Sequence, residues 1–217
     1  MTAFCLVHGA WHDGACWDPA VAALAALGHD AVAPDMPFHD PAATFEERIE
    51  PALRALDGLP DPVVAVGHSM GARYAPAVAA RREGSRLVHL CPGLGPLREG
   101  FPWPPTGADG TSAWDRDAAI EALYPRLAPE AAGRLADHLR PMAPPAGDHP
   151  RGRPPRPATA VVIALDDELF DPSSERAATR EKLGVAAIEI PGGHFPMAED
   201  PEALAALLDR LAREVAP

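Results

Sequence analysis

The stretch Val66-Gly67-His68-Ser69-Met70-Gly71 decides how this chain is interpreted, because it places one serine on a Gly-x-Ser-x-Gly turn. Residues 62–66 before it are apolar and largely β-branched, which is typical of a buried strand. Residues 72–82 after it are rich in alanine and predict a helix. A sharp turn from strand to helix needs little side chain around the serine, and the two glycines meet that requirement. We therefore expect the Ser69 hydroxyl to stand above the sheet, beside the first free N–H groups of the helix.

Short apolar runs alternate with helical stretches along most of the chain. This alternation predicts an α/β fold, with about six mostly parallel strands and helices on both faces of the sheet. Ligands of such sheets bind beyond the carboxyl ends of the strands. The expected strands are residues 3–8, 30–33, 63–66, 87–90, 160–165 and 186–190, and the expected helices are residues 19–27, 44–56, 72–82, 174–182 and 201–215.

Residues 92–157 interrupt the alternation. They are rich in proline, contain Trp103 and Trp114, and predict two short helices at 115–124 and 129–139. An insertion between two core strands, above their carboxyl ends, is in the position of a lid. The alternative is a surface excursion with no part in binding. We expect one domain over residues 1–217, with residues 92–157 as a small, proline-rich lid insertion.

Composition excludes several classes of function. Hydrophobic residues make up 47% of the 217 and charged residues 23%, as in an ordinary globular domain. The net charge of −12 argues against nucleic acid and anionic membrane surfaces as partners. The first residues enter an expected strand directly, without the basic segment or cleavage-type site of a signal peptide. The three cysteines lack the spacing of a metal site. We expect a cytoplasmic monomer or homodimer with no metal or organic cofactor.

A serine nucleophile needs a base within hydrogen-bond reach and a third group that orients the base. The apolar run at residues 161–165 ends in acids, which favours Asp167 as the orienting group, with Asp166 as the alternative. His194 follows two glycines in a loop after the last expected strand. It is the only histidine in such a loop downstream of both the serine and the acids, so we predict that it is the base. Two further acids, Glu168 and Asp171, are expected to be surface or capping groups.

The oxyanion hole requires two N–H donors. The first strand runs into a His-Gly turn, so we assign the N–H groups of Ala10 and Met70 to this role. Losing one such donor typically costs about 3 kcal/mol of transition-state stabilisation. We expect His8 and His68 to have structural roles near the site, and Asp35 to fix a loop. An apolar substrate pocket is expected to be lined by Trp11, Leu94, Trp103 and Phe195.

These motifs resemble the α/β-hydrolase superfamily. Within it, they look closest to the compact branch of plant-type methylesterases, hydroxynitrile lyases and their bacterial relatives. The order serine, acid, histidine is the order found in these hydrolases. The resemblance implies about six parallel strands under a small lid. It rests on Leu6-Val7-His8-Gly9-Ala10-Trp11-His12 followed by Trp17, on Gly67-His68-Ser69-Met70-Gly71, on Asp167, and on Gly193-His194-Phe195-Pro196-Met197.

Two departures from that branch bear on activity. Its hydroxynitrile lyases carry a threonine where this chain has Gly9, and a lysine where it has Phe195. Without that lysine no cation is placed to stabilise departing cyanide, so lyase activity is not expected. The expected function is a serine hydrolase that acts on a small, mostly uncharged carboxylic ester, thioester or lactone through an acyl-enzyme. The alternatives are a ligand-binding protein on the hydrolase fold, or a C–C hydrolase, lyase or perhydrolase that uses the same site.

Overall fold

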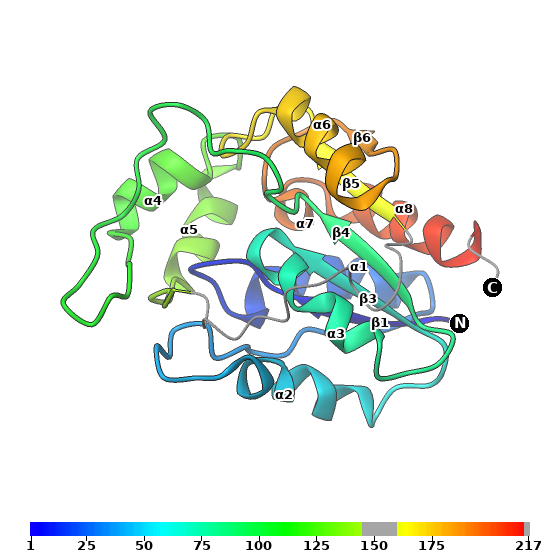
Figure 1. Cartoon of the computed structure of the whole chain (residues 1–217). Helices are drawn as coiled ribbons and strands as arrows, with labels where there is room; N and C mark the ends of the chain where they lie inside the picture. Colours follow the sequence, from blue (N-terminus) through cyan, green and yellow to red (C-terminus); the bar gives the residue numbers. More distant parts are fainter. Residues whose placement is uncertain (145–159, 215–217) are drawn as a thin grey trace.

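A single six-stranded sheet forms the centre of the protein (Figure 1). The computed structural model describes residues 1–144 and 160–214. All neighbouring strands pair in parallel, in the order β2-β1-β3-β4-β5-β6, which confirms the predicted α/β fold. The strands are β1 (Ala3–Val7), β2 (Asp30–Val32), β3 (Val63–His68), β4 (Arg86–Leu90), β5 (Ala160–Ala164) and β6 (Ile188–Ile190).

Helices cover both faces of this sheet, because successive side chains of each strand point to opposite sides. Helices α1 (Asp18–Ala26) and α8 (Pro201–Glu214) pack on one face. Helices α2 (Phe45–Leu56), α3 (Ala75–Ala79) and α6 (Pro172–Leu183) pack on the other. Along β1, Phe4 and Leu6 belong to the first core, and Ala3, Cys5 and Val7 to the second. Within the described residues, no helix is long and apolar enough to cross a membrane.

The segment after β3 differs from the single helix expected at residues 72–82. A short 3-10 helix, η2 (Ser69–Arg73), comes first, and the α-helix α3 then spans only Ala75–Ala79. Pro76 explains the break, since proline has no N–H for a helical hydrogen bond and is tolerated only in the first turn. The turn at Ser69 therefore leads into a tight 3-10 helix before the α-helix begins.

The two helices expected in the insertion are present as α4 (Arg116–Leu123) and α5 (Pro129–Asp137). Figure 1 shows both at the end of the sheet opposite the N-terminus. Leu123 and Tyr124 are buried and join the core that also contains α1 and α8. The insertion is thus packed onto the core of the α/β fold over this part of its length. Residues 145–157 of the expected lid lie outside the described residues.

One arginine is buried in the connection that follows β2. Arg48 is fully buried on α2, and its guanidinium donates to the carbonyl oxygens of Ala43 (3.1 Å), Asp40 (2.9 Å) and Pro144 (3.1 Å). Within the described residues no carboxylate pairs with it. The charge is therefore solvated by backbone carbonyls, and it ties the chain before α2 to the end of the insertion.

We predict that Arg48→Met lowers the free energy of unfolding by about 3 kcal/mol, because it leaves several buried carbonyls without a donor. Arg54→Met is the matched control on the same helix, since Arg54 is exposed and its one ion pair among the described residues is with Glu50. That variant should change stability by less than about 0.5 kcal/mol. Urea unfolding followed by circular dichroism measures both, and equal losses would refute the role given to Arg48.

Candidate active site

Ser69 occupies a strained turn between β3 and η2. Its φ of +50° lies in the left-handed region, which non-glycine residues rarely adopt. A Cβ atom on Gly71 would lie 2.5 Å from the carbonyl oxygens of both Val7 and His8, and one on Gly67 would lie 2.6 Å from the Cα of Ala72. Both glycines are therefore required by close backbone approach, as the sequence motif predicts.

His194 is bound to Asp167 and not to Asp166. The Nδ1 atom of His194 lies 2.7 Å from Oδ2 of Asp167, and both side chains are almost completely buried. The other oxygen of Asp167 accepts the backbone N–H groups of Leu169 (2.8 Å) and Phe170 (2.9 Å), which fixes the carboxylate. This arrangement suits an acid that orients an imidazole.

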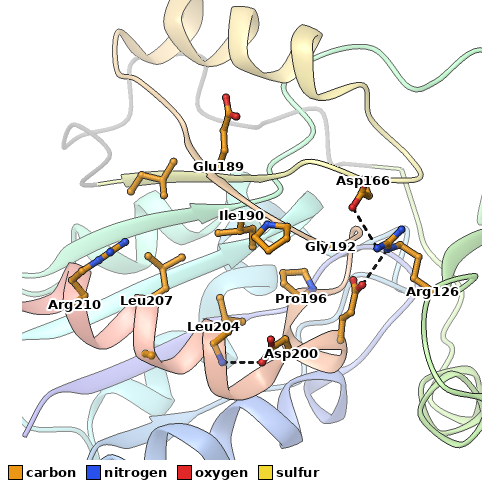
Figure 2. A pocket seen from close by; sticks show the side chains of 15 residues that line it. Arg126, Asp166, Glu189, Ile190, Gly192, Pro196, Asp200, Leu204, Leu207 and Arg210 are labelled. Atoms are coloured by element: carbon orange, nitrogen blue, oxygen red, sulfur yellow. Dashed lines mark hydrogen bonds and ion pairs between the residues drawn. The ribbon is translucent and has the colours of Figure 1, made fainter.

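Asp166 points away from this pair, toward the edge of the sheet. Its side chain is 53% exposed and forms an ion pair of 3.3 Å with Arg126. Figure 2 shows both residues beside a second cavity, which lies between β6 and α8 and has a volume of about 630 Å³. Asp166 lies in the turn after β5 and Asp167 directly follows that turn, so the chain changes direction between the two neighbouring acids.

His68 joins the serine turn to the histidine loop. Its Nε2 donates to the carbonyl oxygen of His194 over 2.8 Å, and the two rings lie 4.8 Å apart between centroids. Within the described residues, no hydrogen bond joins Ser69 to His194. Such bonds are often long before substrate binds and tighten in the complex, so the missing bond does not argue against this pairing. The expectation of a structural role for His68 agrees with this contact.

His8 orients the peptide that carries the Ala10 N–H. Burial lowers the pKa of His8, so the ring is neutral. Its Nε2 accepts the N–H of Met36 over 2.9 Å, and its Nδ1 therefore carries the proton and donates to the carbonyl oxygen of Gly9 (2.9 Å). Because the carbonyl and N–H of a trans peptide point in opposite directions, holding the Gly9 carbonyl also directs the Ala10 N–H.

The two expected oxyanion donors are near the nucleophile and unpartnered. A Cβ on Gly9 would lie 3.0 Å from the Cβ of Ser69, so the Gly9–Ala10 peptide lies against the serine. Across the described part of the chain, the backbone N–H groups of Ala10 and Met70 donate to no acceptor. Both residues line the same cavity as Ser69. Two free donors beside a serine are what an oxyanion hole requires.

The cavity above Ser69 has a volume of about 650 Å³ and mainly apolar walls. Trp11, Leu94 and Trp103 line it, as expected, together with Leu97, Met142, Leu169 and Phe170. The rings of Trp11 and Trp103 meet edge to face at 4.9 Å, and Trp11 Nε1 donates to Ser112 (3.0 Å). Most of these residues come from the insertion and the strand ends, so the insertion forms part of the cavity wall.

Phe195 is a correction to the expected pocket, since it is not among the residues that line this cavity. It is 6% exposed, and its ring packs against those of His12, His68 and Tyr124. Phe195 immediately precedes α7 (Pro196–Glu199), and the start of that helix turns the side chain into the core. Phe195 therefore packs in the core next to the site and does not face the cavity above Ser69.

Two carboxylates hold the histidine loop, a role that the sequence did not indicate for either. The backbone N–H of His194 donates to Glu168 (2.9 Å), and that of Gly193 donates to Glu199 (2.6 Å). Burial raises the pKa of Glu168. Glu168 is therefore not the surface or capping group expected, whereas Asp171 does cap α6 by accepting the N–H of Ser174. The Gly192-Gly193 pair was the sequence signal for these acceptors, because the backbone N–H groups of a buried loop need hydrogen-bond partners.

His12 links the insertion to the loop after β1 that contains Ala10. Its Nδ1 lies 2.7 Å from the carbonyl oxygen of Ala10, and its Nε2 lies 2.5 Å from the hydroxyl of Tyr124, directly after α4. Burial lowers the pKa of His12 to about 4, so the ring is neutral near pH 7. Asp35 has the expected loop-fixing role, because it accepts the N–H of Gly14 over 2.6 Å.

Cys91, Asp167 and His194 are the described residues whose grouping could hold a metal ion, with one ligand atom of each within 4.8 Å of the others. Burial and the neighbouring Asp167 raise the pKa of the Cys91 thiol well above its usual range. Metals bind the thiolate, which is scarce under these conditions, and the Asp167 and His194 side chains already bind each other. A hydrogen-bonded pair beside a protonated thiol describes this group better than a metal centre.

We predict that Gly71→Ala lowers the free energy of unfolding by about 3 kcal/mol or more, because two carbonyl oxygens of β1 and its loop must move. Gly58→Ala is the control, since a Cβ there would approach nothing closer than 3.9 Å, and it should change stability by less than about 1 kcal/mol. Chemical unfolding measures both. A Gly71→Ala protein as stable as Gly58→Ala would contradict the close approach.

We predict that stability falls as the pH is lowered from 6.5 toward 4. The folded protein protonates His12 only near pH 4, whereas the unfolded chain does so near pH 6.5, so the unfolded state binds more protons between these values. Each such histidine contributes a slope of up to about 1.4 kcal/mol per pH unit. His12→Gln should reduce the slope of unfolding free energy against pH by about that amount, and an unchanged slope would contradict the buried, neutral His12.

The whole chain is similar to known hydrolases. Residues 6–207 match the model of the alpha/beta hydrolase family. A pyrethroid hydrolase of Sphingobium wenxiniae is 28% identical over 94% of this chain and 85% of its own length. The esterase PIR7B of Oryza sativa is 44% identical over a shorter stretch, 31% of this chain and 29% of its own.

Solved structures show the same fold. A pyrethroid hydrolase from Sphingobium faniae superposes with a TM-score of 0.74 over 98% of both chains, at 23% identity. A methylesterase from Arabidopsis also reaches a TM-score of 0.74, at 18% identity, over 99% of this chain and 100% of its own. With the sheet order, the serine turn and the family match in agreement, this chain belongs to the alpha/beta hydrolase family.

Proposed function

We propose that this protein is a serine esterase that hydrolyses a small carboxylic ester through an acyl-enzyme, with Ser69, His194 and Asp167 as its catalytic triad. The observation that carries this proposal is the buried 2.7 Å bond between His194 and Asp167 beside the strained turn of Ser69. The two unpartnered N–H groups at the same cavity support it further. Related proteins named as a pyrethroid hydrolase and as esterases favour a carboxylic ester as the bond that is cleaved.

The reaction follows from the roles of these groups. The Ser69 oxygen attacks the carbonyl carbon of the ester, and Nε2 of His194 takes the hydroxyl proton. Asp167 holds the Nδ1–H of His194 and stabilises the imidazolium that forms. The oxygen of the tetrahedral intermediate accepts the N–H groups of Ala10 and Met70. Collapse of this intermediate expels the alcohol, which takes the proton from His194.

Hydrolysis of the acyl-enzyme completes the cycle, with water as the attacking group and Ser69 as the leaving group. His194 takes a proton from the water as the water oxygen attacks the acyl-enzyme carbonyl, and it then returns this proton to Ser69 as the acid departs. No step needs a metal or an organic cofactor. The cavity of about 650 Å³ is within the range of small-molecule sites, and its apolar walls favour an ester with a hydrophobic body.

We predict that Ser69→Ala lowers kcat by about six orders of magnitude by removing the nucleophile. Asp167→Asn should lower kcat by about four orders of magnitude by leaving the imidazole in the wrong tautomer. Asp166→Asn is the matched control, because this neighbouring acid is exposed and ion-paired elsewhere, and it should keep kcat within about twofold. The measurement is turnover of p-nitrophenyl and methyl esters of increasing acyl length.

Circular dichroism should show that all three variants are folded. Full turnover in Ser69→Ala would refute the proposed mechanism. Equal losses in Asp166→Asn and Asp167→Asn would refute the assignment of the acid. The acyl length at which the wild-type protein is fastest would measure how much of the cavity the acyl group fills.

A further inference from the structure

Two cationic side chains line the cavity above Ser69, and no acid does. They are Arg73 and Lys182, and the remaining lining residues in the described part of the chain are apolar or uncharged. This contrasts with the protein as a whole, whose 31 acidic and 19 basic residues give a net charge of −12. A cavity with only positive charge in an acidic protein attracts a negative group locally, while the rest of the surface repels it.

Lys182 is held at the cavity by the protein itself. It is the only lysine of the chain and lies in the last turn of α6. Its Nζ donates to the carbonyl oxygen of Leu94 over 2.6 Å, and Glu175 of the same helix accepts the N–H of Leu94 over 3.2 Å. An ammonium group has three donors, so two remain for a ligand. Lys182 forms no ion pair within the described residues.

Arg73 provides the second charge, closer in sequence to the nucleophile. It is the last residue of η2 and is exposed. Across the described residues its guanidinium forms neither an ion pair nor a side-chain hydrogen bond, so all five donors are available. A 3-10 helix rises about 2 Å per residue, which places Arg73 roughly 8 Å along the helix axis from Ser69. A planar guanidinium at this position matches a carboxylate.

We propose that Arg73 and Lys182 bind a carboxylate of the substrate, so that the preferred substrates are esters with a second, free carboxylate several bonds from the ester carbonyl. This inference rests on the proposed esterase function and refines it. This differs from the mostly uncharged ester expected from the sequence, because the distal end of the proposed substrate is anionic. The walls of the cavity are mainly apolar and accommodate the methylene chain that separates the two ends.

The test compares matched pairs of substrates. Monomethyl esters of dicarboxylic acids with four to ten carbons are assayed beside methyl esters of monocarboxylic acids of equal length, in a pH-stat at pH 7.5. We expect kcat/KM to be higher for the anionic member at chain lengths near eight carbons. The ratio of kcat/KM between the two members should fall in 0.5 M NaCl, because salt screens the attraction.

Variants assign the effect to the two cations. Arg73→Gln combined with Lys182→Gln should lower the ratio about tenfold or more, since hydrogen bonds to charged groups are strong. Arg81→Gln removes one positive charge from an exposed site outside the cavity and should leave the ratio as in the wild-type protein. No preference for the anionic ester, or a ratio that the double variant leaves unchanged, would overturn the proposal.

The outcomes separate this proposal from the proposed function. Ester turnover that depends on Ser69 but shows no anionic preference overturns only the carboxylate site. If no ester of the panel is turned over, calorimetric titration of monomethyl suberate into the Ser69→Ala protein tests the site without catalysis. Binding that weakens about tenfold when both cations are replaced supports the site, and absence of binding overturns it.

Discussion

The close contact between the Gly71 backbone and the end of β1 is the constraint on which the site depends. The carbonyl oxygens of Val7 and His8 lie where a side chain at position 71 would begin. This contact packs η2 against the loop after β1. As a result, the N–H of Met70 and the N–H of Ala10 come from two different strand ends and still line one cavity with Ser69. A bulkier residue at position 71 would separate them.

Neutral histidines serve this site as fixed hydrogen-bonding groups. Burial lowers the pKa values of His8, His12 and His68, so each ring is neutral at pH 7 and has one donor and one acceptor nitrogen. His8 and His12 hold the peptides around Ala10, and His68 holds the backbone of His194. His194 differs from these three, because its Nδ1 is paired with the carboxylate of Asp167.

Fully or partly buried carboxylates accept hydrogen bonds from the loops, as neighbouring strands do within the sheet. Glu168 and Glu199 accept the N–H groups of the histidine loop, and Glu175 accepts those of the loop at Leu94 and Gly95. Burial raises the pKa values of Glu168 and Glu175. Loops without regular structure leave their N–H groups unpaired, and a carboxylate can accept several of them at once. The rigid positioning of catalytic groups on loops depends on these acceptors.

The sequence by itself determined the α/β fold, the serine turn and the relative order of the catalytic groups, because these follow from local patterns. Glycine spacing, strand length and the alternation of apolar runs act over a few residues. The division of residues 72–82 into a 3-10 turn and a short helix was not foreseen, although Pro76 was a local signal for it.

Only the tertiary structure showed that His194 binds Asp167 and not Asp166, and that Phe195 lies in the core. It also showed that Glu168 and Glu199 accept the N–H groups of the histidine loop. Each of these outcomes depends on which way one side chain faces and on what the folded chain presents to it. The same is true of Arg73 and Lys182, which are over a hundred residues apart and meet one cavity only through the fold. Such pairings arise from packing between elements, for which a single sequence carries no local pattern.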